Sequence, residues 1–177
     1  TFGDYAGKYG RAVAVRPRHD ASSVYICFRG VRRELEGDAA SAPGAARDRE
    51  AVAQTSMASL DWARKTAGGA ADRAPALKAH RGTLGYHKSI YGSSGLATGL
   101  REWLESPAAS LGPNGRLLFV GFSLGGALAQ ITALHAALDF PHLAARMHVL
   151  GIGPTQWASP ELAAAFDVAF GTRSAQM

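Results

Sequence analysis

Short apolar runs alternate with longer segments of helix-forming residues along most of the chain. The apolar runs are bounded by turn-forming residues, which is typical of strands. The predicted strands are 11–17, 22–30, 116–120 and 147–154. The predicted helices are 47–66, 80–106, 124–138 and 159–170. An initial strand pair followed by alternating helices and strands predicts an α/β fold with a mostly parallel sheet.

Local signals refine several of these elements. The residues R-H-D-A separate the first two strands, which indicates a hairpin or two adjacent strands. The run 116–120 is short and apolar, as expected of a strand that is buried on both faces. Ser159 stands before Pro160, so we expect it to cap the N-terminus of the last helix.

Length and composition favour one domain over residues 1–177, with 47% apolar residues available for a core. The net charge is +5, but the arginines are scattered in pairs, so we predict no nucleic-acid partner. The one cysteine, Cys27, excludes an internal disulfide and lies in an apolar run typical of a core thiol. The chain begins at Thr1 without a secretory signal, so we expect a processed or longer protein and assign no compartment.

The strongest candidate for chemistry is a serine between two glycines, in the sequence Gly121-Phe-Ser123-Leu-Gly125. A predicted strand precedes this pattern and a predicted helix follows it, which is the context that a nucleophile on a sharp turn requires. Such a turn strains the backbone, and the two glycines remove the clashes that side chains would cause. The alternative is a glycine-lined turn with an idle serine.

In this interpretation Ser123 lies at the carboxyl ends of the strands, where open α/β sheets place their sites. The N-terminus of the following helix supplies a positive dipole end and unpaired N–H groups. The N–H of Leu124 is the one predicted to point at a developing oxyanion.

Five stretches of the chain resemble segments of the class 3 lipase family, which consists of α/β-hydrolases that cleave acylglycerol esters. These stretches, in chain order, are V-Y-I-C-F-R-G (24–30), S-L-D-W-A (59–63), H-R-G-T-L-G-Y-H-K-S-I (80–90), V-G-F-S-L-G-G-A-L-A (120–129) and V-L-G-I-G-P (149–154). The resemblance implies an α/β-hydrolase-like three-layer fold, with the C-terminal strands of the family missing from this chain.

Carried over position by position, the resemblance makes Ser123 the nucleophile and gives the backbone N–H groups of Leu124 and Val31 to an oxyanion hole. Gly121 and Gly125 become the glycines of the nucleophile elbow. The chain departs from the family at two of these positions. Val31 stands where the family usually has serine or threonine, and Phe122 stands where it often has histidine.

The acid and the histidine of a serine triad follow the serine in these hydrolases, and we expect this chain to end before both. Asp139 and His135 lie about 24 and 18 Å along the predicted helix from Ser123, too far to reach it. His80 is the one imidazole that distance does not exclude, although its alternative role is to hold a loop by hydrogen bonds. No histidine or carboxylate cluster has metal-ligand spacing, so we predict neither metal nor cofactor.

The resulting expectation is a serine ester hydrolase, a triacylglycerol lipase or other carboxylic ester hydrolase, that acts on lipid esters. Transient contact with a membrane or lipid-droplet surface, and self-association through an exposed sheet edge at 148–153, are further expectations. Two alternatives stay open: a hydrolase-like binding scaffold without catalysis, and another acyl-transfer enzyme such as a thioesterase or acyltransferase.

Overall fold

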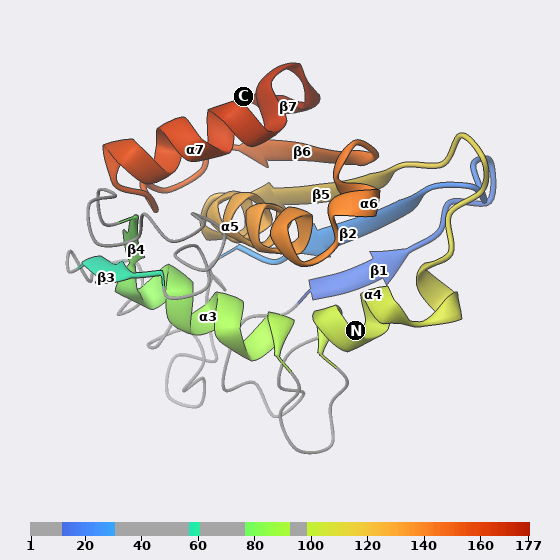
Figure 1. The fold of residues 1–177 in the computed structure, drawn as a ribbon, viewed down its shortest axis with the longest axis horizontal. Helices are drawn as coiled ribbons and strands as arrows, with labels where there is room; N and C mark the ends of the chain where they lie inside the picture. Colours follow the sequence, from blue (N-terminus) through green and yellow to red (C-terminus); the bar gives the residue numbers. More distant parts are fainter. Residues whose placement is uncertain (1–11, 31–56, 61–76, 93–98) are drawn as a thin grey trace, which may run out of the picture.

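A five-stranded sheet forms the centre of the computed structural model, which describes residues 12–30, 57–60, 77–92 and 99–177. The strand order is β1-β2-β5-β6-β7 (Figure 1). The strands are β1 (Ala12–Val15), β2 (Val24–Phe28), β5 (Leu117–Phe122), β6 (Met147–Ile152) and β7 (Ser174–Gln176). Only β1 is antiparallel to its neighbour, which confirms the predicted α/β fold with a mostly parallel sheet.

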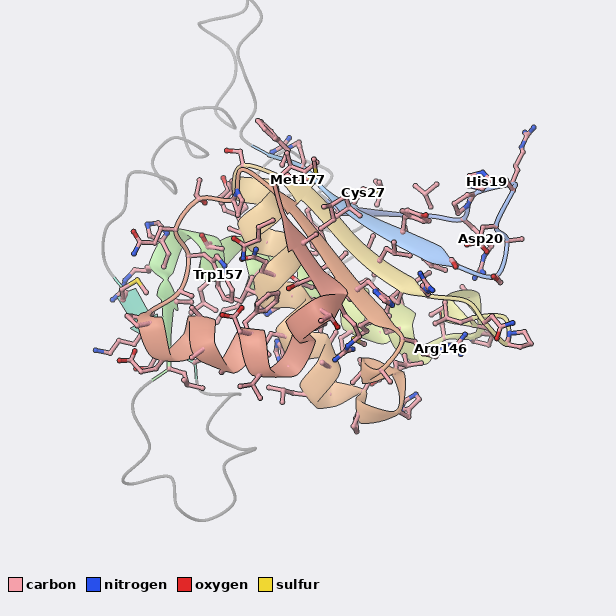
Figure 2. All side chains as sticks on the ribbon, turned by 90° about the horizontal axis from the view of Figure 1, so that it is seen from above. His19, Asp20, Cys27, Arg146, Trp157 and Met177 are labelled. Carbon is pink, nitrogen blue, oxygen red and sulfur yellow. The ribbon has the colours of Figure 1, made fainter. Side chains whose placement is uncertain are left out.

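The described helices lie on one face of this sheet (Figures 1 and 2). The chain passes from β2 to β5, β6 and β7 in one direction, and right-handed crossovers then bring the connecting helices to the same face. The helices are α3 (Arg81–Tyr91), α4 (Leu100–Glu105), α5 (Leu124–Asp139), α6 (Pro141–Ala144) and α7 (Pro160–Phe170). Two 3₁₀ turns, η1 (Pro107–Ala109) and η2 (Gly171–Arg173), complete the described helical elements. None of these helices is long and apolar enough to cross a membrane.

Helix α5 is the central element of the core. It packs against β2, β5 and β6, and small residues in its first turns let it lie close to the sheet. The inward-facing side chains Ile26, Phe119 and Met147 of these three strands are fully buried. At the far end of the core, Trp157 packs edge-to-face on Phe166 of α7.

The hairpin and the last helix agree with the sequence prediction. β1 and β2 pair from Ala12 with Phe28 to Val15 with Tyr25. Ser159 caps α7, because its Oγ accepts a hydrogen bond from the backbone N–H of Leu162. These elements depend on local signals, which explains why the sequence reveals them.

The predicted helix at 47–66 is wrong where the structure describes it. Residues 57–59 form β3 (Met57–Ser59), which pairs antiparallel with β4 (Lys78–His80); residues 47–56 and 61–66 lie outside the described ranges. β4 is held in turn by the segment before α7, since the His80 N–H donates to Trp157 O at 2.7 Å. Pairing with distant segments therefore overrides the helical propensity of these residues.

The predicted helix at 80–106 is interrupted. α3 ends at Tyr91 and Gly92 has an extended backbone, while α4 begins only at Leu100. Residues 93–98 lie outside the described ranges. Glycine is a weak helix former, so the break at Gly92 has a local cause.

The outer edge of the sheet also differs from the prediction. We expected the strand at 148–153 to lack an outer neighbour and so to promote self-association, but β7 pairs with β6 from Val149 to Gly151. Met177 continues this pairing, because its N–H donates to Gly151 O at 3.0 Å and its carbonyl accepts from the Gly153 N–H at 2.6 Å. The short, polar sequence S-A-Q gives no strand signal, so only the pairing reveals β7.

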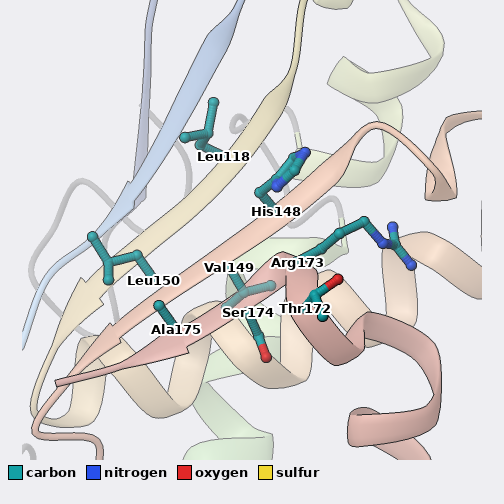
Figure 3. Close-up of a pocket in the computed structure, with 8 residues that line it drawn as sticks. All are labelled: Leu118, His148, Val149, Leu150, Thr172, Arg173, Ser174 and Ala175. Atoms are coloured by element: carbon teal, nitrogen blue, oxygen red, sulfur yellow. The ribbon is translucent and has the colours of Figure 1, made fainter.

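The opposite face of the sheet carries none of the described helices. Many of its side chains are apolar and half-buried, among them Cys27, Leu118, Val120 and Leu150, and His148 lies beside Leu118. Burial raises the pKa of the Cys27 thiol. A shallow cavity of about 280 Å³ lies on this face between β5, β6 and β7 (Figure 3).

Candidate active site

The candidate site is built on the turn between β5 and α5. Ser123 is the single residue between the end of the strand at Phe122 and the start of the helix at Leu124. Its backbone has φ 54° and ψ −125°, and it is the one non-glycine residue with positive φ in the part of the chain that the structure describes. The predicted sharp turn is therefore present, and the strain falls on the serine itself.

Glycines allow the chain to reverse so tightly. A Cβ on Gly121 would overlap the carbonyl of Gly125 and would lie 2.7 Å from the nitrogen of Gly126. A Cβ on Gly125 would overlap the carbonyl oxygen of Phe28 and would lie 2.9 Å from the carbonyl carbon of Arg29. Any side chain at either position would thus displace main-chain atoms, as the sequence pattern predicts.

Backbone hydrogen bonds fix Ser123 in this conformation. The Ser123 N–H donates to Ile152 O at 2.8 Å, which ties the turn to the end of β6. The Ser123 carbonyl accepts from the N–H groups of Gly126 and Ala127 at 2.9 and 3.3 Å, which begins α5. The residue is half-buried, and its side chain does not cap the helix.

The N–H of Leu124 is the first amide of α5, and no helix residue precedes it to accept its hydrogen bond. The Leu124 side chain is buried, so the helix end is anchored in the core. The positive end of the helix dipole adds to the attraction for negative charge at this point.

The end of β2 lies against the same turn. A Cβ on Gly30 would lie 2.8 Å from the carbonyl oxygen of Phe122, and the carbonyl of Phe28 touches Gly125. The segment F-R-G, which precedes the second predicted oxyanion donor, is therefore in main-chain contact with the elbow. Val31 itself lies outside the described residues.

The histidines do not gather around Ser123 as a group. His148 pairs with Leu118, five residues before Ser123 on β5, which corresponds to roughly 16 Å along the strand. His19 and His142 are exposed on other parts of the surface. His80 is buried and caps α3, because its Nδ1 accepts from the Thr83 N–H at 3.5 Å. Burial lowers the pKa of His80.

A buried histidine pair that the sequence analysis missed joins α3 to α5. His87 Nε2 and His135 Nδ1 lie 2.8 Å apart, and His87 Nδ1 lies 3.0 Å from Thr132 Oγ1. The ring of Tyr91 stacks on His135 with centroids 4.2 Å apart. Helical spacing in the sequence could have revealed this cluster. His87 and Tyr91 lie on one face of α3, and Thr132, His135 and Asp139 lie on one face of α5.

Asp139 closes this cluster at the surface. Its Oδ2 accepts hydrogen bonds from Tyr91 OH and Arg101 Nε, both at 3.0 Å. Burial lowers the pKa of His87 far below its ordinary value and lowers that of His135 to about 4, against the opposing effect of Asp139. Burial and the nearby Asp139 raise the pKa of Tyr91. The cluster therefore holds two neutral imidazoles at neutral pH.

No three histidine, cysteine, aspartate or glutamate side chains within the described ranges lie close enough together to hold a metal ion. The chemistry that the described site offers is that of a serine hydroxyl beside backbone N–H groups.

Comparison with known proteins gives one family and several solved structures. Residues 48–175 match the family model described as Lipase (class 3). Among curated proteins no sequence match was found. Lipase II from Rhizopus niveus superposes with a TM-score of 0.64 at 16% identity, covering 99% of this chain and 54% of its own. The triacylglyceride lipase of Rhizomucor miehei gives a TM-score of 0.59 at 17% identity, covering 90% of this chain and 49% of its own.

A third structure is a triacylglycerol lipase described as having a serine protease triad as its catalytic centre. It gives a TM-score of 0.62 at 18% identity and covers 94% of this chain and 51% of its own. The chain thus spans about half the length of these solved structures. The likeness confirms the predicted α/β-hydrolase fold.

Proposed function

Because the chain belongs to the lipase (class 3) family, we propose that the protein is a lipase-type ester hydrolase in which Ser123 is the nucleophile. The observation that carries this proposal is the strained backbone of Ser123 at a strand-to-helix turn whose glycines leave no room for a side chain. Strain of this kind concentrates at functional sites, where it holds a reacting group in one orientation.

In the proposed reaction, Ser123 Oγ attacks the carbonyl carbon of the ester, and the hydroxyl proton passes to a base. The negative charge that develops on the carbonyl oxygen is stabilised by the N–H groups of Leu124 and Val31. The C–O bond to the alcohol then breaks, the alcohol leaves with the proton, and the acyl group stays on Oγ. Water hydrolyses this acyl-enzyme and restores the serine. No cofactor enters these steps.

The base in this proposal is a histidine oriented by a carboxylate, as the triad of the related triacylglycerol lipase suggests. None of the described histidines is assigned this role, since His80 caps α3 and the others make other contacts or lie away from Ser123. His87 and His135 bond to each other, and His148 stands at the opposite end of its strand.

The proposed substrate is a lipid ester such as an acylglycerol, met at a membrane or lipid-droplet surface. One of the matched structures, a fungal lipase–inhibitor complex, is described as a model for interfacial activation. The net charge of +5 would favour contact with an anionic lipid surface.

Covalent labelling tests the nucleophile. Treatment with a fluorophosphonate probe should add one phosphonyl group to Ser123, because the hydroxyl displaces fluoride from phosphorus. Mass spectrometry of the peptide that contains residues 117–130 locates the adduct. Ser123→Ala should abolish it, whereas Ser110→Ala, at an exposed serine away from the turn, should leave it unchanged.

A binding scaffold without catalysis is the second candidate. The observation that favours it is that the described histidines make other contacts or lie away from Ser123. A folded protein that no fluorophosphonate labels would support the scaffold. If it is labelled and cleaves thioesters but not glycerol esters, the activity is that of another acyl-transfer enzyme.

A further inference from the structure

Three exposed apolar side chains form a row across the carboxyl end of the sheet. Phe122, the last residue of β5, pairs with Ile152, the last residue of β6. Met177 follows β7 and lies beside Ile152, because its backbone forms hydrogen bonds with Gly151 and Gly153, the residues on either side of Ile152. The exposed fractions of Phe122, Ile152 and Met177 are 62%, 36% and 81%. We call these three residues the apolar row.

The apolar row occupies a single face. In-register residues on neighbouring strands point to the same side of a sheet, and their inward-facing neighbours Gly121 and Gly151 are buried. The row is therefore on the face opposite α5, the same face that carries Leu118, Leu150 and Ala175 (Figure 3). Two strand spacings of about 4.8 Å give the row a length of about 10 Å.

Within the described residues, the aromatic ring of Phe122 is largely uncovered. A single exposed apolar side chain is ordinary on a protein surface, but three in register on adjacent strands form a patch, and patches of this kind mark contacts with other molecules. Ring atoms of Phe122 would lie 3.7 and 4.0 Å from Cβ atoms placed on Gly30 and Gly153. The ring therefore stands between two residues without side chains.

The apolar row is also adjacent to the backbone of the residue that reacts in the proposed mechanism. Phe122 precedes Ser123 in the chain, and Ile152 accepts the Ser123 N–H through its carbonyl. The apolar row therefore begins at the residue next to the proposed nucleophile and at the end of the strand that holds its backbone N–H.

Resting on the proposed function, we infer that Phe122, with Ile152 and Met177 beside it, contacts the acyl chain of the ester and favours long-chain over short-chain acyl groups. The contact removes methylene groups from water, which stabilises the complex in proportion to the apolar area buried. A short acyl group does not reach the row and gains nothing from it. Phe122 acts here as a specificity-determining residue, and not on the reacting bond.

Two fluorophosphonates, one with a dodecyl and one with an ethyl group on phosphorus, test this inference. In each case the Ser123 Oγ–P bond forms, the P–F bond breaks, and fluoride and the hydroxyl proton leave. The measured quantity is the ratio of the second-order labelling rates, dodecyl over ethyl. Phe122→Ala should lower this ratio about tenfold, which corresponds to about two buried methylene groups.

Two further variants guard against a folding effect. Phe122→His introduces the residue that the family often has at this position and should lower the ratio by a smaller factor, because an imidazole is less apolar than a phenyl ring. Val168→Ala truncates an apolar side chain of α7 that is 90% exposed, and should leave the ratio unchanged. If Phe122→Ala lowers both rates by the same factor, or neither, the inference is overturned.

A binding measurement separates this inference from the proposed function. In Ser123→Ala protein, a fluorescent dodecanoyl amide should bind about tenfold more weakly when Phe122 is also alanine. If neither fluorophosphonate labels the wild-type protein, the nucleophile assignment fails, and this binding difference alone decides whether the apolar row contacts an alkyl chain. If the Ser123→Ala protein and the Ser123→Ala/Phe122→Ala protein bind the dodecanoyl amide with equal affinity, the inference is contradicted whatever the labelling shows.

Discussion

At the scale of single residues, glycines determine the geometry of the candidate site because they have no side chain. Gly121, Gly125 and Gly30 are in contact with main-chain atoms of other segments, at distances where a Cβ has no room. Ser123 takes up the remaining strain in its own φ of 54°. The turn is thus specified by positions that must stay small and not by attractive side-chain contacts.

Alanine substitution at Gly125 tests whether this position must stay without a side chain. Gly125→Ala should lower the free energy of unfolding by about 1–3 kcal/mol, because its Cβ overlaps the Phe28 carbonyl and displaces either α5 or the end of β2. The matched control is Gly85→Ala in α3, where a Cβ meets nothing within 4 Å. That substitution should raise the stability by about 0.5–1 kcal/mol through helix propensity. Urea unfolding of both variants measures the difference; equal effects would contradict the proposed overlap.

The nucleophile turn could be predicted from the sequence because its signals are adjacent in the chain: an apolar run, G-x-S-x-G and small helix formers. The apolar row could not, because Phe122, Ile152 and Met177 lie at the ends of three strands and become neighbours only through register. Val31 shows a different limit. The resemblance gives it a role, and that role stays a prediction because the residue lies outside the described ranges.

At the scale of elements, helix α5 connects the candidate site to the buried histidine pair. Ser123 stands at its start, while Thr132, His135 and Asp139 lie on its second half and contact α3 and α4. The groups that face His135 are His87 and Tyr91 from α3, Arg101 from α4 and Asp139 from α5 itself. The positive charge of Lys88 also lowers the pKa of His87.

The buried pair His87 and His135 should make the folded protein less stable as the pH is lowered. Both histidines have pKa values in the folded state below the ordinary 6.5, and that of His135 is about 4. The unfolded chain therefore binds these protons first, so stability is greatest above pH 6.5 and falls as the pH is lowered from about 6.5 toward 4. The urea midpoint, measured at several values between pH 7.5 and 4.5, should show this fall.

His135→Gln removes one of the two titrations and should make the fall in the urea midpoint shallower, although the variant starts from lower stability at pH 7.5. His19→Gln, at an exposed histidine in the turn between β1 and β2, is the control. It should keep the wild-type dependence of the urea midpoint on pH. A wild-type slope in His135→Gln would show that other groups cause the pH dependence.

Elements with strong local patterns were predictable, and short ones were not. β5, β6, α5 and α7 each combine an apolar run or a helix-forming segment with clear turn or capping signals. β3, β4 and β7 have three residues each, and their residues form strands only because a partner segment supplies hydrogen bonds. Pairing over a long separation in sequence leaves no periodic pattern in the residues themselves.

At the scale of the whole molecule, the described part of the chain is a sheet with helices on one face and an apolar, half-buried surface on the other. The strands differ in how many neighbours they have. β5 pairs with β2 from Leu117 to Gly121 and with β6 over its full length, whereas β7 pairs only with β6. That residues 1–177 form one domain stays a prediction.

Amide hydrogen exchange should reflect this arrangement. The amides of Phe119 and Val120 in the centre of β5 should exchange most slowly, because they open only with the whole sheet. The amides of Ser174 to Gln176 in β7 should exchange much faster, since a short edge strand can separate locally. Mass spectrometry of peptic fragments measures both segments, and equal protection of β5 and β7 would contradict the topology described here.

The contact between the end of β2 and the beginning of α5 has one more consequence. There the two segments meet through peptide groups alone, at Gly30 with Phe122 and at Gly125 with Phe28. The spacing between Ser123 and the end of β2 is consequently set by dimensions that every polypeptide shares. Side chains on either segment can therefore change without altering that spacing.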